Sequence, residues 1–234
     1  MRIFYLQKRE LRSLLLALLL PVLCFSYSLG TQRAAAVLAE PYYQGSGAVN
    51  CLSLTVNVDW GEEYIPDMLQ LFREKQVRVT FFVTGRWAKE HPELLAEMAA
   101  AGHEIGNHAY SHTSPNSLDV AGNKDEILRT EEAIREASGC TTLLYAPPSG
   151  EREPQVLQAA EELGYLTVLW SIDTIDWQKP QPEVIVQRVM SKLHPGAIIL
   201  SHPTEQTLAA LPQLIDNIQA EGYQFVTVAE NLSL

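Results

Sequence analysis

Polar and titratable side chains gather at five places in the sequence, each directly after a short apolar run. The five segments are NVDWGEE (57–63), GNHAYSH (106–112), APPSG (146–150), SIDTIDW (171–177) and SHP (201–203). If the apolar runs are parallel strands, their carboxyl ends meet at one edge, where the loops of α/β folds carry function. The segments together supply imidazoles, carboxylates and aromatic rings, which is a composition typical of a hydrolytic site.

One pair of histidines has a spacing suited to a metal ion. His108 and His112 are four residues apart, which brings two imidazoles to one face of a helical turn. Asp59 or Glu62 could supply a carboxylate and complete a His-His-carboxylate triad with positions open for water and substrate. Because the chain has six histidines, such a pair also arises by chance, and a structural role is the alternative.

A second carboxylate and histidine follow adjacent predicted strands. Asp176 lies in DTIDW, and His202 closes the next run as LSH. A carboxylate beside a histidine fixes its tautomer and raises its pKa, which suits a general acid. Taken singly, Asp176 could cap a loop and His202 could bond a backbone carbonyl; their joint placement favours the acid.

The elements that position these residues alternate regularly from Cys51 onward. Seven strands are expected at 52–58, 78–83, 103–106, 142–145, 166–171, 197–201 and 224–228. Helices are expected at 66–75, 92–101, 124–137, 154–163, 182–193 and 208–220. Prolines in several first turns and glycines after several last turns agree with these limits. Seven βα repeats without a Gly-rich phosphate loop predict an α/β barrel, complete or not, rather than an open doubly wound sheet.

The first 29 residues differ from the rest of the chain. A basic segment, Arg2 to Arg12, precedes twelve consecutive apolar residues at 14–25. This pattern predicts a signal peptide or a retained N-terminal membrane anchor over 1–29, with a buried N-terminal helix as the alternative. Either of the first two places the domain outside the cytoplasmic membrane, in the cell envelope or beyond. Residues 30–48 are expected to be a linker and 49–234 the domain.

Charge and cysteine content exclude some classes of protein. The formal net charge of −11 argues against nucleic-acid binding, which needs clustered positive charge. The cysteines Cys24, Cys51 and Cys140 form no Cys-x-x-Cys pair, so no zinc-thiolate or redox motif is present. Cys51 and Cys140 are expected as two buried free thiols, with a disulfide as the alternative.

Five motifs in order resemble those of the polysaccharide deacetylase domain (NodB homology, carbohydrate esterase family 4). They are VTFFVTG, GHEIGNHAYSH, APPSG, DTIDW and IILSH. The resemblance covers the chain from about Cys51 to its end. It is strongest for the sporulation-associated branch of Gram-positive bacteria, whose first motif has a Trp-Gly-acidic form as in VDWGEEY. It implies an irregular (β/α)7 barrel that removes acetyl groups from peptidoglycan or chitin-like glycans.

The resemblance also implies roles for single residues. His108 and His112 would hold a divalent metal, usually zinc, which polarises the acetyl carbonyl and activates a water. His202 would protonate the departing amine, and Asp176 would tune His202.

Four further residues are expected to contact the glycan. By the same resemblance Trp177 and Leu200 would shape an apolar pocket around the acetyl methyl group. Pro147 and Tyr110 complete the expected substrate-binding set, Tyr110 as a ring on which a sugar could stack.

Two positions depart from the family pattern. The family's first motif, Thr-Phe-Asp-Asp-Gly, carries the general base and a metal ligand, and here Asn57 stands in the base position. An amide has no useful basicity near neutral pH. Asp59 is the preferred metal ligand, since it would share a strand side with Asn57; Glu62 is the alternative. The arginine that normally pairs with the base is replaced by Ala146, and the joint loss is chemically coherent because an arginine facing an amide would be unpaired.

Three interpretations follow. The protein is an active deacetylase in which Asp59, Glu62 or Glu63 replaces the base, or in which weaker assistance slows the reaction by about 10² to 10⁴. Alternatively, it is a metal-retaining glycan-binding protein without turnover, or a structural envelope component without metal. The retained His202 and DTIDW favour the first, because a pure binder needs no tuned proton donor.

Overall fold

The computed structural model describes residues 40–234. The signal or anchor expected at 1–29, Cys24, and most of the linker expected at 30–48 lie outside this part. Between residues 40 and 234, no helix combines the length and the apolar character needed to cross a bilayer.

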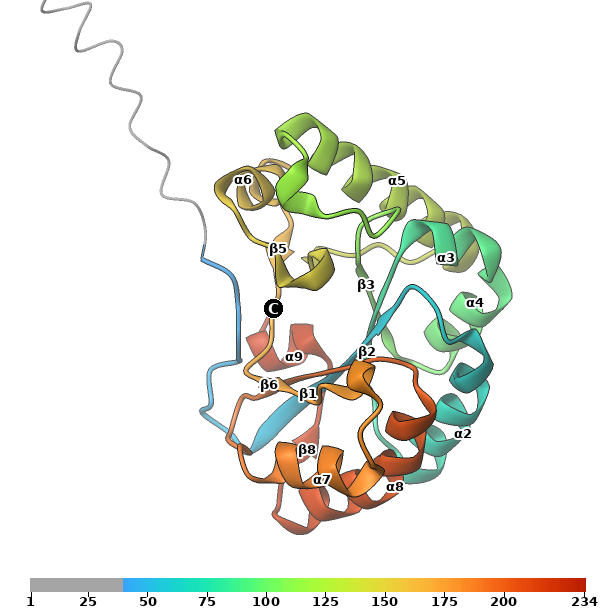
Figure 1. Cartoon of the computed structure of the whole chain (residues 1–234), viewed down its shortest axis with the longest axis vertical. Helices are drawn as coiled ribbons and strands as arrows, with labels where there is room; N and C mark the ends of the chain where they lie inside the picture. Colours follow the sequence, from blue (N-terminus) through green and yellow to red (C-terminus); the bar gives the residue numbers. More distant parts are fainter. Residues whose placement is uncertain (1–39) are drawn as a thin grey trace, which may run out of the picture. The chain divides into compact units, whose positions relative to one another are not determined.

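The centre of the described chain is a parallel sheet that curls without closing (Figure 1). Seven of its strands lie in the order β5-β4-β3-β2-β1-β7-β6, and β8 pairs only with the start of β1. The expected irregular (β/α)7 barrel is confirmed. The strands within residues 40–234 are β1 (Cys51–Val58), β2 (Thr80–Val83), β3 (Glu104–Asn107), β4 (Leu144–Tyr145), β5 (Leu166–Thr167), β6 (Ile172–Asp173), β7 (Ile198–Ser201) and β8 (Gln224–Phe225).

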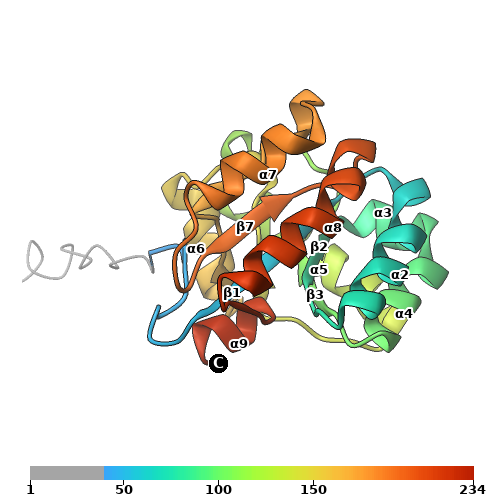
Figure 2. The same cartoon turned by 90° about the horizontal axis from the view of Figure 1, so that it is seen from below.

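Helices form an outer layer around the strands (Figures 1 and 2). The six predicted helices are confirmed as α2 (Ile65–Lys75), α4 (Pro92–Ala100), α5 (Val120–Ser138), α6 (Pro154–Glu162), α7 (Pro182–Met190) and α8 (Glu205–Ala220). Two short helices, α3 (Gly85–Glu90) and α9 (Val228–Leu232), are additional, as are 3-10 turns at η1 (Glu62–Tyr64), η2 (Pro115–Ser117), η3 (Pro148–Gly150) and η4 (Asp176–Gln178).

Two of the predicted strands end earlier than expected. The run predicted at 166–171 is interrupted, because β5 pairs with β4 while β6 pairs with β7. The run predicted at 224–228 ends at Phe225, because Thr227 begins α9. There the Thr227 hydroxyl accepts from the Glu230 backbone N–H, and the Glu230 carboxylate accepts from the Thr227 backbone N–H at 2.9 Å. This capping box is visible in the sequence as TVAE and outweighs the β-propensity of the run.

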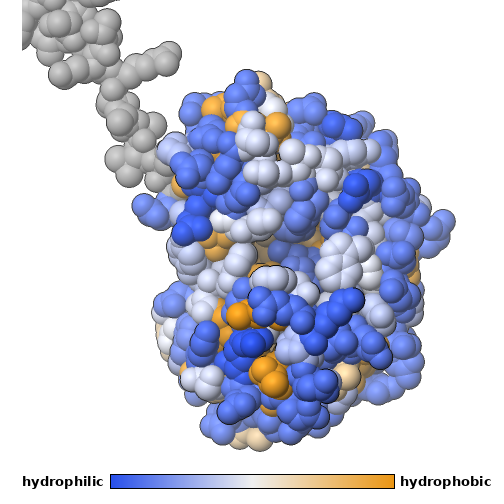
Figure 3. All heavy atoms as spheres, viewed as in Figure 1, coloured by the Kyte–Doolittle hydropathy of each residue, from blue (hydrophilic) through white to orange (hydrophobic). Residues whose placement is uncertain are grey.

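Strand β1 divides its side chains between two interiors. Leu52, Leu54, Val56 and Val58 are buried in the main apolar core beneath the helices. The intervening side chains face inward: the Ser53 and Thr55 hydroxyls donate to backbone carbonyls of Thr227 and Ile199, at 3.1 and 3.0 Å. Asn57 is the next residue on this inner side, at the strand's carboxyl end. With the apolar side chains enclosed, the face drawn in Figure 3 is mostly hydrophilic.

Residues 42–45 run from the β5 edge of the sheet to the segment just before β7, and we call them the strap. Tyr42 donates to Thr167 and accepts from Leu169 just beyond β5, at 2.8 and 2.7 Å. Gly45 donates to Gly196 just before β7, at 2.7 Å. The strap therefore lies beside the seam of the barrel, where β5 and β6 do not pair. These residues, expected in the linker, are hydrogen-bonded to the domain.

The strap's packing generates a stability prediction. A Cβ added to Gly45 would lie 2.1 Å from Asn231 Oδ1 and 2.4 Å from the Asn231 backbone oxygen, so Gly45→Ala must displace backbone. We expect the variant to lose about 1 to 3 kcal/mol of unfolding free energy in urea titrations of the full chain. Ser46→Ala, at the exposed next position, is the control and should change it by less than about 0.5 kcal/mol. Equal midpoints for both variants would contradict a packed strap.

Candidate active site

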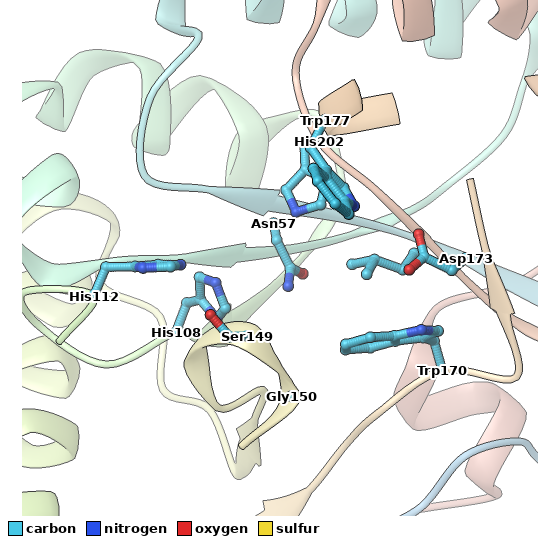
Figure 4. A pocket seen from close by; sticks show the side chains of 10 residues that line it. Asn57, His108, His112, Ser149, Gly150, Trp170, Asp173, Trp177 and His202 are labelled. Atoms are coloured by element: carbon cyan, nitrogen blue, oxygen red, sulfur yellow. The ribbon is translucent and has the colours of Figure 1, made fainter. Parts of the chain in front are cut away.

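A cavity of about 400 Å³ opens at the carboxyl ends of the strands and joins all five polar segments. Its lining residues are Asn57, His108, His112, Ser149, Gly150, Trp170, Asp173, Trp177, Leu200 and His202 (Figure 4). Asn57 lies at the centre of the group, with the two histidines of the pair on one side and Trp170 and Asp173 on the other.

The histidine pair is assembled by a loop and not by the expected helical turn. Ala109 and His112 both have left-handed backbone conformations, with φ of 62° and 55°, so residues 108–112 double back on themselves. Glu126 of α5 holds the loop, because its Oε2 accepts from the backbone N–H groups of Tyr110 and Ser111 at 3.0 and 2.8 Å. The rings of His108 and His112 lie 5.1 Å apart, measured between centroids.

The surroundings of His108 keep its imidazole neutral. Burial, followed by the nearby His112, lowers the pKa of His108 to about 3. Its Nδ1 lies 2.6 Å from the backbone carbonyl oxygen of Ala146, which places the proton on Nδ1. Nε2 therefore keeps a lone pair, which is the state in which a histidine binds a metal ion.

His202 and Asp176 form a buried pair. The Asp176 carboxylate is fully enclosed and lies 2.7 Å from His202 Nδ1. Its other oxygen accepts from the His202 backbone N–H and the Thr207 hydroxyl, both at 2.6 Å. Burial raises the pKa of Asp176, but the hydrogen bond and attraction from His202, with the bond from Thr207, outweigh it and hold that pKa below its usual value. The pairing expected from the sequence is present, and Nε2 of His202 is left free to face the cavity.

The acids of the first strand end do not reach this cavity. β1 ends at Val58, so the alternation that would place Asp59 beside Asn57 no longer applies. The Asp59 carboxylate accepts instead from Arg86 Nη2, at 2.9 Å to each oxygen, and from the Thr84 hydroxyl at 2.9 Å. Glu62 lies 4.0 Å from His91 Nε2, and Glu63 lines a different cavity beside Trp60.

The donors present do not complete a three-ligand metal site. His108 and His112 fit a metal ion in identity and, for His108, in tautomer. No group of three His, Cys, Asp or Glu side chains suited to a metal exists within residues 40–234. The residue after Asn57 cannot help, because Val58 is buried in the core on the opposite side of the strand. The His-His-carboxylate set expected with Asp59 is therefore not formed in this geometry.

Asn57 is a buried amide whose side-chain oxygen has no hydrogen-bond partner among the described residues. The residue is 6% exposed, and its Oδ1 is enclosed without a hydrogen-bond partner. At the position of the family's arginine, Ala146 packs in an apolar cluster with Phe82 and Val168, against which Trp170 also packs. A carboxylate at residue 57 would therefore find no cation at residue 146, which agrees with the paired loss expected from the sequence.

The expected substrate-binding residues divide into two groups. Trp177, 55% exposed at the rim, and Leu200, 5% exposed, line the cavity. Pro147 is buried ahead of η3 and does not line it. Tyr110 does not line it either, because its ring is covered by the Arg129 guanidinium, 3.7 Å from the ring centroid. The binding roles of all four stay predictions.

Sequence reasoning missed several residues of the cavity wall. Trp170 lies in the break between β5 and β6, where a continuous strand was expected. Asp173 is the first acid of the DTIDW motif, and its Oδ1 accepts from the Ile175 backbone N–H at 2.8 Å. Ser149 has a φ of 57°, and a Cβ on Gly150 would lie 2.7 Å from Trp170. The SG dipeptide after PP signalled this tight turn, whereas nothing in the sequence signalled Trp170.

Comparison with known proteins agrees with this geometry. The sequence profile of the polysaccharide deacetylase family matches residues 44–168. The chain is 41% identical over 191 residues to the uncharacterised protein YlxY of Bacillus subtilis, covering 82% of this chain and 60% of YlxY. It is 31% identical to a peptidoglycan-N-acetylglucosamine deacetylase of Bacillus cereus, covering 80% of this chain and 70% of that protein.

A solved structure with the same fold is described as a pseudoenzyme. BA3943 of Bacillus anthracis, a pseudoenzyme of carbohydrate esterase family 4, superimposes with a TM-score of 0.80 at 38% identity, over 82% of this chain and 69% of that one. A mutant of BA3943 described as having restored enzymatic activity matches equally well, with a TM-score of 0.80. On the profile, the relatives and the barrel together, this chain belongs to the polysaccharide deacetylase family.

Proposed function

We propose that this domain binds an N-acetylated glycan of the peptidoglycan or chitin type without hydrolysing its acetyl groups at a measurable rate. The observation that carries the proposal is Asn57, an amide in the cavity wall where family members have a basic carboxylate. Asp59, the nearest acid in sequence, is held by Arg86 and Thr84. The names of the Bacillus cereus relative and of BA3943 support the glycan and the loss of activity, respectively.

The cavity has the groups that an acetamido sugar needs for binding. Leu200 and the ring of Trp177 offer an apolar surface to the acetyl methyl group. Nε2 of His202, Nε2 of His108 and the Asn57 amide offer hydrogen bonds to the amide and hydroxyl groups of a sugar. Because the chain carries a net charge of −11, recognition has to rest mainly on shape and these hydrogen bonds.

Slow deacetylation is a second candidate function, and the His202–Asp176 pair favours it. A binding protein has no need of a proton donor that is oriented by a buried carboxylate. Loss of a general base slows a hydrolysis by about 10² to 10⁴ without abolishing it. In this case His202 would still protonate the departing amine.

Zinc binding by His108 and His112 is also part of the proposal. When bound, the metal would polarise the acetyl carbonyl and activate a water.

Export and attachment to the membrane, expected from the first 29 residues, remain proposals supported by the basic and apolar segments of the sequence.

The first test compares binding with turnover. In the full chain supplied with zinc, N-acetylglucosamine oligomers should bind measurably by calorimetry while acetate release stays near background. Asn57→Asp should raise acetate release by about tenfold or more, and Asn57→Asp with Ala146→Arg should raise it further, because the cation holds the carboxylate ionised. Asn50→Asp, the same change at an exposed position, is the control. Rapid acetate release by the unmodified chain would overturn the proposed loss of activity.

The second test measures the metal directly. His108→Ala removes one imidazole of the proposed pair of ligands, so we expect zinc affinity, titrated by calorimetry, to fall by at least about tenfold. His91→Ala is the matched control, since His91 lies outside the cavity near Glu62. Equal zinc affinities for the two variants would place the metal elsewhere.

The third test concerns the pH dependence of stability. The pKa of Asp176 is lower in the folded chain than its ordinary value of 3.8, so its stabilising contribution is present above about pH 3.8 and is lost as pH falls through the folded pKa. Asp176→Asn should cost about 2 to 3 kcal/mol at pH 7, and the difference from the unmodified chain should shrink toward pH 3. Urea unfolding at both pH values measures this, with the exposed Asp67→Asn as control. A difference that does not change with pH would contradict an ionised Asp176.

A further inference from the structure

A second cavity of about 240 Å³ adjoins the candidate active site across a shared wall. The Ser149–Gly150 turn and Trp170 line both cavities. Tyr43, Arg152 and Leu169 complete the second one. A ligand longer than one sugar that occupies the first cavity would therefore meet the second directly.

Arg152 gives this cavity a positive charge, and the other residues that line it are uncharged. Its Nη1 donates to the Gly150 carbonyl at 3.1 Å, and its guanidinium lies 5.9 Å from the centroid of the Tyr43 ring. The ion pairs among residues 40–234 do not include Arg152. The neighbouring Glu151 carboxylate makes no ion pair with Arg152; it accepts from the Ser114 hydroxyl and the Asn116 backbone N–H at 2.6 and 2.9 Å.

Acidic residues line the cavities on either side of the second one: Asp173 lines the first, and Glu151 and Glu153 line the third. A third cavity, lined by Ser149, Gly150 and Arg152 together with Asn116, Glu151 and Glu153, continues from the second. Within the described chain, Arg152 is the one lysine or arginine that lines any of these three adjoining cavities. A guanidinium with free N–H groups matches a carboxylate in geometry as well as in charge.

We propose that the second cavity binds a sugar residue carrying a free carboxylate, next to the N-acetylated residue held in the first cavity. This inference rests on the proposed glycan binding and extends it to the neighbouring residue of the polymer. The rings of Trp170 and Tyr43 offer faces to the sugar, and Arg152 binds its carboxylate. The carboxylate can belong to a lactyl ether, as in peptide-free peptidoglycan strands, or to a uronic acid.

The strap gives this subsite its shape. Tyr43 lies between Tyr42, bonded beyond β5, and Gln44, bridged to Ala197. The backbone on both sides of Tyr43 is thus held against the domain, which positions the ring opposite Arg152.

The test compares three oligosaccharides of equal length by calorimetry on the full chain. They are a neutral N-acetylglucosamine oligomer, a peptide-free peptidoglycan oligomer with lactyl carboxylates, and an oligomer alternating N-acetylglucosamine with a uronic acid. We expect at least one acidic oligomer to bind about three- to fivefold more tightly than the neutral one, as for a partly exposed ion pair. The preference should shrink as salt is raised from 0.05 to 0.5 M, values chosen to shorten the Debye length from about 14 to about 4 Å.

Variants separate the subsite from general charge and from the proposed function. Arg152→Gln should remove the preference, so that acidic and neutral oligomers bind this variant with equal affinity, and Arg152→Lys should keep part of it. Arg135→Gln, at an exposed position on α5, makes the same change of charge and should keep all of it. Equal affinities of the unmodified chain for acidic and neutral oligomers, or a preference that survives Arg152→Gln, would overturn the subsite alone. Failure of every oligomer to bind would overturn the proposed glycan binding, and the subsite with it.

Discussion

The alternation of side chains along β1 is the constraint on which the site depends. β1 is held in register by β2 on one side and β7 on the other, so its residues cannot rotate between the two interiors. Asn57 must face the cavity, and Val58 must fill the core. Because the residue after Asn57 is an apolar valine buried in the core, the first strand end contributes one polar group to the cavity.

The cavity wall is completed by contacts between loops that are distant in sequence. The bond from His108 to the Ala146 carbonyl joins the third strand end to the fourth, and the bond from His202 to Asp176 joins the seventh to the loop after the sixth. Each of these bonds fixes a histidine tautomer, and neither depends on Asn57. This explains how the amide can stand in the centre of an otherwise ordered site: the neighbouring groups are positioned by other partners.

The open seam of the barrel has a comparable influence on the outer part of the site. Because β5 and β6 do not pair, the backbone groups at the β5 edge need other partners, and the strap supplies some of them. The same break leaves Trp170 outside any strand, where its ring separates the two cavities. The strap and Trp170 therefore lie at the seam and also line the second cavity, the strap through Tyr43.

The sequence by itself determined the barrel, the order of its helices and the five segments that form the cavity. Periodicity, prolines in first turns and polar residues at strand ends are local signals. The structure confirms the helices and the shared cavity that they predicted. The sequence also located the amide at residue 57 and the missing arginine at residue 146, because these are identities at motif positions.

Only the tertiary structure decided where the remaining acids point. Asp59 is one residue beyond the end of β1, and Arg86 and Thr84, more than twenty residues away in sequence, draw its carboxylate away from the histidines. Likewise, Arg152 has no ion-pair partner within residues 40–234 because of which segments meet across the seam. The position of the strap depends on the same contacts. Such contacts are long-range, and hydrogen-bond geometry selects among several chemically equivalent partners, so sequence spacing alone does not specify them.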